Sequence, residues 1–421
     1  MPITSPSRPA ASASPCLLSA TGRRRRAFGA FGALVGLLTA GLAPAALAQR
    51  ASSTSAGATG EASAGVGPST WTVTATTLDV LTGPDDDIPV TLDLDVYLPS
   101  SATTTNPAPA MLHTHGFGGD KANGESVANA EYFASKGYVV ITHSTQGFGG
   151  STGCIGLDST DYDAKNVAKI VDLLATMPEV ATNGPGDPKV GLLGGSYGGG
   201  LQGGAAYLDS RIDAISIGRS WNALQYSLVP NNWVLDPEAN MYDLIGHEQG
   251  VFKQQWTTMF FGVGSAAPAQ NTGGCDPFSQ QLAYPGAVPC SGFIPEICPI
   301  YASLTSTGNT LAGQREVIFK TSIANYIDQV NAPTMLVQGM PDTLFTPTEA
   351  AATYTALKKR GVPSTMIWHN GGHGGYNGNP GEAEAYNGSW VDRPSEFANA
   401  YLPRRTLQWF EKYVRGEASL D

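Results

Sequence analysis

The sequence predicts a mostly parallel β-sheet covered by helices on both faces, and three observations indicate this class. Beyond Trp71, short apolar runs rich in β-branched residues alternate with segments of helical periodicity, which is typical of strands joined by crossover helices. The first two runs alternate apolar and polar residues, which predicts an antiparallel opening hairpin. One long interval, residues 221–323, lacks this rhythm and predicts an insertion.

Residues 1–48 are expected to be an export signal that is removed from the mature chain. The basic cluster of residues 23–26 precedes a short, glycine-rich apolar run that ends in the small-residue pattern A-L-A, the order found in secretory signals. The paired arginines look like a twin-arginine signal. A general secretion signal and a retained anchor helix are the alternatives.

Four regions follow from composition and pattern. Residues 49–70 are small and polar, so they predict a disordered linker that cannot bury enough apolar surface to fold. Residues 71–220 and 324–421 are predicted to form one α/β core. Residues 221–323, with their aromatic residues and Pro/Gly breaks, are predicted to form a mainly helical cap inserted between two strands, where it would cover a site.

The charge balance excludes two classes of partner. The chain has 24 Lys and Arg against 35 Asp and Glu, a formal net charge of −11, and five of the arginines lie within residues 1–48. Nucleic acids and anionic membranes both attract basic surfaces, so neither is expected as a partner. No second apolar run has the length of a membrane span, so no stable span is expected after signal removal. The sequence predicts no oligomeric state.

Cysteine usage is consistent with an oxidising compartment. Cys154, Cys275, Cys290 and Cys298 remain once a signal containing Cys16 is removed, and this even number favours one or two disulfides with three pairings available. Because the last three cysteines lie close together in sequence, a bridge among them is expected. A zinc site is disfavoured because no C-x-x-C or nearby histidine pair accompanies them.

The strands and helices are expected in the following places. The hairpin is expected at residues 71–80 and 90–99, and the buried strands at residues 110–115, 138–143, 189–194, 212–217, 334–339 and 365–368. Helices are expected over residues 164–174, from a capping box at residues 346–349 to Gly361, and over residues 394–416 with an interruption near Pro403.

Ser196 is the candidate nucleophile. Residues 194–198 form G-x-S-x-G between the predicted strand 189–194 and a glycine-rich helix, residues 199–208. This is the context of a nucleophile elbow, in which the serine occupies strained backbone and the flanking glycines avoid collisions. A flexible glycine-rich loop is the alternative. A phosphate-binding loop fits less well because the lysine of G-x-x-x-x-G-K-[ST] is missing.

A serine hydroxyl needs a base to accept its proton and a third group to orient the base. Of the six histidines, His373 lies in a glycine-rich loop just beyond the last predicted strand and is the predicted base, with His369 as the alternative. Asp342 follows the strand 334–339 at the sheet edge where sites collect, and is the predicted acid. A solvated turn aspartate is the alternative. The order Ser196, Asp342, His373 is that of the α/β-hydrolase arrangement.

The oxyanion of such a reaction needs hydrogen-bond donors. The backbone N–H of Tyr197 is the first predicted donor, and that of Phe117 or Gly118, in the loop after the first buried strand, is the second. His113 and His115 share a strand face, but no carboxylate spacing accompanies them, so no metal site is predicted. No cofactor is expected.

Five segments together resemble the Xaa-Pro dipeptidyl-peptidase and cocaine-esterase family of serine hydrolases. They are GFGGSTG (147–153), GGSYGG (194–199), SWNALQYSLVPN (220–231), GMPDTLF (339–345) and GGHGG (371–375). The resemblance covers most of residues 71–416, and it implies an α/β-hydrolase core with a helical cap inserted after the strand that follows the elbow helix. Family members commonly continue into a C-terminal β-sandwich, which is not expected here. They can also use a tyrosine hydroxyl where this chain has Phe117.

The sequence therefore predicts an exported serine hydrolase that cleaves a small ester or peptide through an acyl-enzyme on Ser196. A carboxylesterase without peptidase activity is one alternative, and a non-catalytic binding protein on a hydrolase fold is another. A dipeptidyl-peptidase must hold a free ammonium group near its nucleophile. The cap acids Asp236, Glu238, Asp243 and Glu248 offer such a carboxylate, or they form the wet face of a cap helix.

Overall fold

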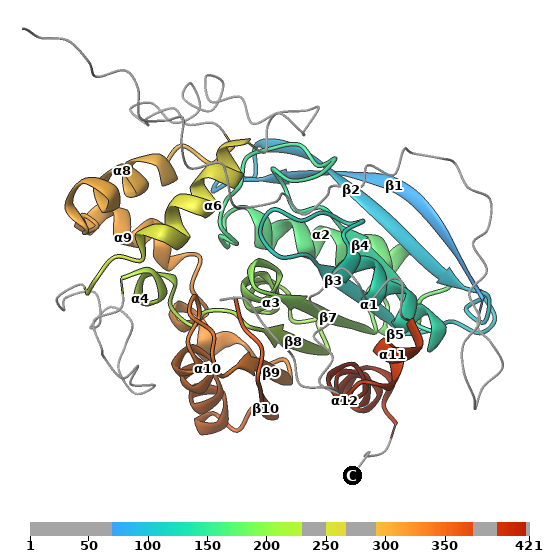
Figure 1. Ribbon diagram of the computed structural model, residues 1–421. Coiled ribbons are helices and arrows are strands. Elements are labelled where there is room, and N and C mark those ends of the chain that lie inside the picture. The colour runs from blue at the N-terminus through green and yellow to red at the C-terminus, as the bar shows by residue number, and fades with distance from the viewer. Residues whose placement is uncertain (1–69, 230–249, 267–291, 374–393, 418–421) are drawn as a thin grey trace, which may run out of the picture. The chain divides into compact units, whose positions relative to one another are not determined.

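A single mostly parallel sheet organises the chain, whose computed structural model describes residues 70–229, 250–266, 292–373 and 394–417 (Figure 1). Its strand order is β1-β2-β4-β3-β7-β8-β9-β10. The strands are β1 (Trp71–Thr82), β2 (Ile88–Pro99), β3 (Ala110–Thr114), β4 (Val139–His143), β7 (Val190–Gly195), β8 (Ala214–Gly218), β9 (Thr334–Gly339) and β10 (Ser364–His369). The pairs β1–β2 and β2–β4 are antiparallel, and all later pairs are parallel. The predicted fold class is confirmed.

The burial pattern explains why the strands have two kinds of sequence. All residues of β3, β4, β7, β8 and β9 are buried, because helices cover both faces of a parallel sheet. β2 keeps alternating buried and more exposed positions, as its sequence predicts. β1 at the sheet edge is mostly exposed and alternates only over residues 79–82. The short hairpin of β5 (Thr182–Gly184) and β6 (Asp187–Pro188) was not predicted, because so few residues carry no periodicity.

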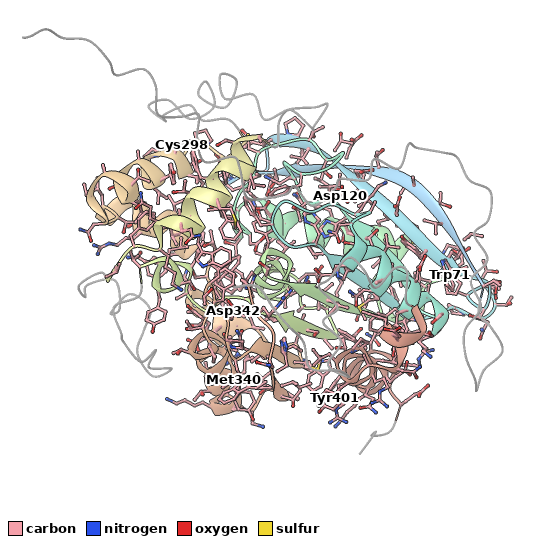
Figure 2. All side chains as sticks on the ribbon, viewed as in Figure 1. Trp71, Asp120, Cys298, Met340, Asp342 and Tyr401 are labelled. Carbon is pink, nitrogen blue, oxygen red and sulfur yellow. The ribbon has the colours of Figure 1, made fainter. Side chains whose placement is uncertain are left out.

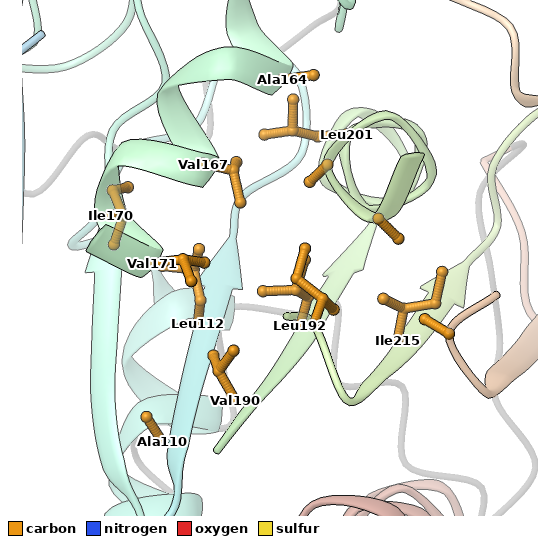
Figure 3. Close-up of a cluster of buried hydrophobic side chains, with 14 of the residues drawn as sticks. Ala110, Leu112, Ala164, Val167, Ile170, Val171, Val190, Leu192, Leu201 and Ile215 are labelled. Atoms are coloured by element: carbon orange, nitrogen blue, oxygen red, sulfur yellow. The ribbon is translucent and has the colours of Figure 1, made fainter. Parts of the chain in front are cut away.

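Helices cover both faces of the sheet. The first face carries α2 (Asp163–Thr176), α3 (Tyr197–Leu208) and α10 (Pro347–Lys359), and the second carries α1 (Gly124–Ser135), α11 (Pro394–Asn399) and α12 (Tyr401–Phe410). Figure 3 shows Val167 and Val171 of α2 and Leu201 of α3 packed against Leu112 and Leu192 of the sheet. These side chains are completely buried, so α2 and α3 hold the strand-to-helix turn between β7 and α3 on a rigid base.

The closing helical segment is interrupted at Ala400 and not at Pro403. Ala400 has extended backbone (φ −72°, ψ 157°) and separates α11 from α12. Pro403 is the third residue of α12, where a backbone N–H would have no partner within the helix, so proline is tolerated there. The segment continues into a π-helical turn, η5 (Glu411–Arg415), and ends at Gly416, whose φ is 83°.

The described residues between β8 and β9 are mainly helical. They form α4 (Leu224–Leu228), α6 (Gln254–Ala266), α8 (Ile297–Thr307), α9 (Ala312–Phe319) and the turns η2 (Ile323–Asn325) and η3 (Ile327–Gln329). α4, α6, α8 and α9 share a second apolar core with loops at the carboxyl ends of the strands. The predicted boundaries of the cap stay predictions. The predicted signal, and the linker up to residue 69, lie outside the described residues.

No helix in the described ranges combines the length and the apolar character that crossing a bilayer requires.

Candidate active site

Ser196 occupies a strained turn between β7 and α3. Its φ of 56° and ψ of −119° are unusual for a residue with a side chain. Neighbouring elements hold this conformation: the Ser196 N–H donates to the carbonyl of Gly218 at the end of β8 (2.8 Å), and the Ser196 carbonyl accepts from the Ser220 hydroxyl (3.0 Å). The strain therefore persists because the end of β8 and the residues just after it hold the serine backbone on both sides.

The glycines beside Ser196 allow close approach of backbone segments. A Cβ on Gly194 would lie 2.6 Å from the carbonyl oxygen of Gly198, and one on Gly198 would overlap the carbonyl of Thr114 in β3. Any side chain at these two positions would therefore push α3 away from the sheet and move Ser196 with it.

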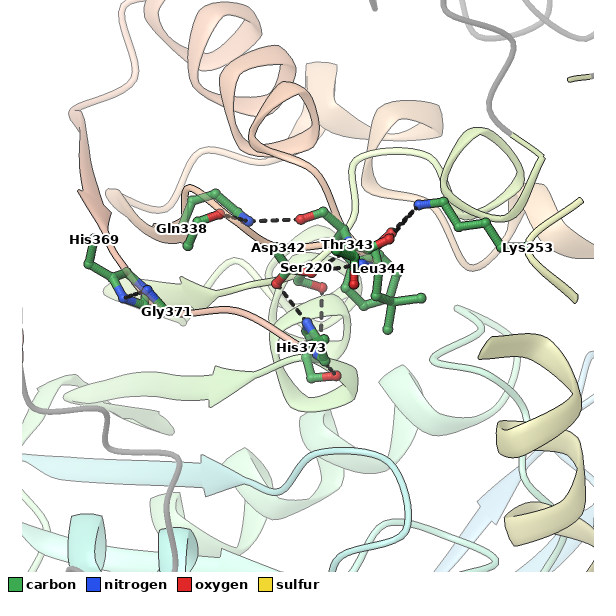
Figure 4. Close-up of polar contacts among 12 residues, drawn as sticks. Ser220, Lys253, Gln338, Asp342, Thr343, Leu344, His369, Gly371 and His373 are labelled. Carbon is green, nitrogen blue, oxygen red and sulfur yellow. Dashed lines mark hydrogen bonds and ion pairs between the residues drawn. The ribbon is translucent and has the colours of Figure 1, made fainter. Parts of the chain in front are cut away.

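Asp342 lies in the loop after β9, with its side chain fully buried. Its Oδ1 atom accepts hydrogen bonds from the N–H groups of Leu344 (2.9 Å) and Phe345 (3.0 Å). The Lys253 ammonium group donates to the carbonyls of Thr343 and Leu344, so the residue before α6 holds this same loop (Figure 4). Burial lowers the pKa of Lys253. These contacts leave Oδ2 of Asp342 to face the histidine.

His373 follows β10 on a loop that folds back onto the end of β9. A Cβ on Gly372 would lie 2.7 Å from the Asp342 Cα, and one on Gly339 would overlap the carbonyl of Gly371. The alternative base, His369, is the last residue of β10 and is buried. Its Nδ1 atom accepts from the Gly371 N–H (3.1 Å), so it shapes the turn that carries His373.

The three side chains form one continuous chain of hydrogen bonds. His373 Nδ1 lies 2.7 Å from Asp342 Oδ2 (Figure 4). His373 Nε2 lies 2.8 Å from Ser196 Oγ. The imidazole ring packs edge-on against the rings of Phe345 (5.3 Å between centroids) and Trp256 (6.1 Å). In Figure 2, Asp342 lies where the loop after β9 meets the inserted helices. The structure thus brings together Ser196, Asp342 and His373, and His369 is not part of this hydrogen-bond chain.

The loop predicted to supply the second amide passes directly beside the nucleophile. A Cβ on Gly116 would lie 3.7 Å from the Ser196 Cβ. The Gly119 N–H donates to the Gly116 carbonyl (3.0 Å), and Gly118 at φ 82° completes this turn. Neither the Phe117 N–H nor the Tyr197 N–H donates to another residue of the described part. Both amides are therefore available to an oxyanion at Ser196.

An apolar pocket of about 100 Å³ opens beside Ser196. Its lining includes Trp221, Phe260, Phe293 and Phe345. No Asp, Glu, Lys or Arg is among the described residues that line it. The pocket is therefore suited to an uncharged, apolar group of the size of a short acyl chain or a single ring.

Helix α6 connects the pocket with both halves of the site. Trp256 contacts His373, and Phe260 packs against Phe117 with ring centroids 5.3 Å apart. Val263 lies 3.0 Å from the position a Cβ on Gly118 would take. The spacing i, i+4, i+7 places these three residues on one helix face. These three residues were not predicted, and their spacing is the signal in the sequence that could have identified them.

His113, His115 and His143 are buried at the ends of β3 and β4. Burial lowers the pKa of His115 to about 4 and that of His143 to about 3, so both rings are neutral at physiological pH. The N–H of Thr145 donates to His115 Nε2 (3.0 Å). Across the described ranges, no three His, Cys, Asp or Glu side chains cluster as metal ligands would.

Two groups of predicted residues lie partly or wholly outside the described residues. Cys154 and Cys298 are buried, with Cys298 near the start of α8 (Figure 2), but Cys275 and Cys290 lie outside the described residues. The predicted bridge among the cysteines stays a prediction. The cap acids Asp236, Glu238, Asp243 and Glu248 also lie outside the described residues, so the predicted ammonium anchor stays untested.

Glu349 in the first turn of α10 links the core to the cap. Its carboxylate accepts from the N–H groups of Asn222 and Ala223 and from the Ser227 hydroxyl. Burial raises the pKa of Glu349 to about 7, although these hydrogen bonds act in the opposite direction. The sequence suggested only a capping acid here, because nothing in the local pattern indicates that the cap covers this helix end.

We expect Glu349→Gln to reduce the loss of stability between pH 5 and pH 8. A carboxyl whose pKa is raised in the folded state binds its proton more tightly there, so the free energy of unfolding falls as pH rises from about 4.5 to about 7. Glutamine does not titrate, so the fall in the free energy of unfolding should be about 3 kcal/mol smaller in the variant. Urea unfolding at both pH values measures it. An equal fall in wild type and variant would contradict the assignment.

Two stretches of the chain are similar to peptidase families, and each contains part of the site. Residues 86–259, which include Ser196, match the family model of X-Pro dipeptidyl-peptidase (S15 family). Residues 297–393, which include Asp342 and His373, match that of the prolyl oligopeptidase family. No curated protein sequence matches the chain at a significant level.

Solved structures show weaker likeness. A hypothetical protein from Pseudomonas aeruginosa is 16% identical with a TM-score of 0.46, covering 81% of this chain and 94% of its own. An acylaminoacyl peptidase from Pyrococcus horikoshii is 15% identical with a TM-score of 0.47, covering 83% of this chain; the chain spans only 43% of that protein. An esterase from Pyrococcus furiosus is 13% identical with a TM-score of 0.44, covering 81% of this chain and 93% of its own.

At this level of similarity the fold assignment rests on the strand order of the chain itself. That order, with its antiparallel opening strands, parallel remainder and strand-to-helix turn at Ser196, is an α/β-hydrolase architecture. The two family matches supply the chemical class. The chain is therefore a serine hydrolase with the α/β-hydrolase fold, similar to X-Pro dipeptidyl-peptidases over residues 86–259 and to the prolyl oligopeptidase family over residues 297–393.

Proposed function

We propose that Ser196, His373 and Asp342 are the catalytic triad of this hydrolase. The observation that carries the proposal is the unbroken hydrogen-bond chain from the Asp342 carboxylate through the His373 imidazole to the Ser196 hydroxyl. Its two contacts, at 2.7 and 2.8 Å, lie within the range that proton transfer requires. The alternative of a non-catalytic binding protein does not account for this chain of hydrogen bonds.

The proposed mechanism has two acyl-transfer steps. Ser196 Oγ attacks the substrate carbonyl while His373 Nε2 takes its proton, and Asp342 stabilises the imidazolium that forms. The N–H groups of Tyr197 and Phe117 donate to the resulting oxyanion. His373 then returns the proton to the leaving group, which departs and leaves an ester on Ser196. Water, activated by the same imidazole, releases the acid.

The apolar pocket favours an ester substrate with an apolar acyl group. An N-terminal dipeptide carries an ammonium group, which needs a carboxylate partner inside a desolvated site. The described pocket lining provides none. We therefore place carboxylesterase activity first, with Xaa-Pro dipeptide release as the second candidate, which the match over residues 86–259 favours.

Three substrates separate the two candidates: p-nitrophenyl butyrate, an Ala-Pro anilide and its N-acetylated form. The ester should be turned over in either case, because its leaving group is better than an amine. Of the two anilides, a dipeptidyl-peptidase should cleave only the free-amine form. A carboxylesterase should cleave neither anilide at a rate comparable with that of the ester. Absence of turnover for all three substrates would contradict the proposed function.

We also propose that the protein is exported through its N-terminal signal and carries at least one disulfide. The basic and apolar order of residues 1–48 and the even number of cysteines that follow it support this. Intact mass of the exported protein, before and after reduction and alkylation, should give a chain that begins near Gln49 and gains labels only after reduction. Four thiols alkylated without reduction would contradict the disulfide.

A further inference from the structure

Two buried carboxyls, Asp158 and Asp163, lie beside the nucleophile helix and have no part in the triad. Both side chains are almost inaccessible to solvent. Burial raises the pKa of Asp163 to about 7 and that of Asp158 well above its usual range. An acid pair in such surroundings costs folding free energy. We therefore expect these acids to make a polar contact that two apolar side chains could not make.

Asp163 makes such a contact with the residue that follows the nucleophile. The Tyr197 hydroxyl donates a long hydrogen bond of 3.4 Å to Asp163 Oδ1. Asp163 is the first residue of α2, and α2 is fixed by its packing on the sheet. Tyr197 thus has its hydroxyl attached to α2 and its backbone N–H beside Ser196. The side chain connects a rigid helix to the proposed oxyanion donor.

The Tyr197 ring also contacts the second proposed donor. Its centroid lies 5.3 Å from that of Phe117, at an interplanar angle of 75°. Phe148 packs edge-on against both rings, at 5.0 Å from Phe117 and 5.6 Å from Tyr197. Edge-to-face pairs of this kind have a preferred geometry. A shift of the Tyr197 ring would therefore move Phe117, and both N–H groups together.

Glycines show how closely the acid pair is packed around this arrangement. A Cβ on Gly200, in the first turn of α3, would lie 2.6 Å from Asp158 Oδ2, and one on Gly156 would overlap Asp163 Oδ2. Leu157 and Asp158 both have left-handed backbone, with φ of 55° and 61°. The backbone at Asp158 is thus strained, and both carboxylates are tightly enclosed, which leaves Asp163 little freedom to move.

We propose that Asp163 is a positioning residue for the oxyanion hole: it holds the Tyr197 hydroxyl, and the Tyr197 ring holds its own N–H and that of Phe117 in place for the developing negative charge. This inference rests on the proposed function. Misplacing preorganised donors weakens binding of the transition state more than binding of the substrate. Loss of the contact should therefore lower kcat while KM stays close to its wild-type value.

Four variants test the proposal with p-nitrophenyl butyrate and an alkyl boronic acid, to which Ser196 Oγ adds to form a tetrahedral adduct. Asp163→Leu removes the acceptor at similar volume, and Tyr197→Phe removes the hydroxyl and keeps the ring. Asp163→Asn keeps an oxygen acceptor. Tyr326→Phe is the matched control, because Tyr326 is also buried and beside Asp158 but does not follow a nucleophile in the chain.

We expect Asp163→Leu to lower kcat about 10- to 100-fold and to weaken boronate binding by the same factor, with KM within about twofold of wild type. Tyr197→Phe should show the same pattern, whereas Asp163→Asn and Tyr326→Phe should keep kcat within about threefold. Circular dichroism checks folding, and Tyr197→Phe decides the test if Asp163→Leu does not fold. Unchanged kcat in the folded variants, or a lowered kcat with unchanged boronate affinity, would overturn the inference.

Fluorophosphonate labelling of the wild-type protein separates this result from failure of the proposed function. Labelling at Ser196 together with unchanged kcat in the Asp163 and Tyr197 variants would remove only the inference. Absence of label at Ser196 in the wild type would remove both.

Discussion

Ser196→Ala should lower ester turnover by about five to six orders of magnitude and abolish fluorophosphonate labelling. The Ser196 hydroxyl is the atom that His373 contacts at 2.8 Å, so its removal leaves the imidazole with no nucleophile to activate. Residual rate above the uncatalysed reaction would come from the oxyanion donors and binding alone. The variant should fold normally, because Ser196 is partly accessible and its backbone contacts with Gly218 and Ser220 do not involve the hydroxyl.

The measurement is kcat for p-nitrophenyl butyrate beside in-gel labelling of wild type and variant. Another position serves as control: Ser306→Ala removes an exposed hydroxyl on α8 that bonds only within its own helix, and should keep labelling. Full turnover by Ser196→Ala would show that the site lies elsewhere in the chain.

His373→Asn should lower kcat by about four to six orders of magnitude, whereas His369→Asn should keep it within about tenfold. The amide of asparagine cannot accept the Ser196 proton, so the first variant loses the general base. At position 369 the side-chain oxygen of asparagine can replace Nδ1 as acceptor for the Gly371 N–H. The same substitution thus removes catalysis at one histidine and preserves a turn at the other.

Both variants need the same two controls, thermal unfolding and binding of the boronic acid. A fall in kcat for His369→Asn without a fall for His373→Asn would assign the base to His369. Equal large losses in two folded proteins would mean that the turn at Gly371 is as important as the base, and the assignment would then rest on the pH dependence of each variant.

Much of the core could be predicted because its signals are local. The apolar runs that became β3, β4, β7, β8 and β9 have no alternation, and a strand buried on both faces has no need of it. Predicted strand ends moved by one or two residues, for example from residues 212–217 to Ala214–Gly218, because strand ends depend on pairing partners. The break lies at Ala400 and not at Pro403 for a different reason, since proline is compatible with a first helical turn.

The sequence by itself determined the strand-to-helix turn at Ser196. The motif G-x-S-x-G after an apolar run predicts a strained turn and supplies the glycines that avoid collisions there. The sequence also placed Asp342 and His373 after their strands, because parallel strands end at one edge of a sheet. Only the tertiary structure decided between His373 and His369 as the neighbour of Ser196 Oγ, since this depends on how Gly371 and Gly372 fold back over Asp342. The same holds for the Tyr197–Asp163 contact and for helix α6 above the site. These contacts join residues far apart in sequence, and their energies depend on packing and burial that no local pattern records.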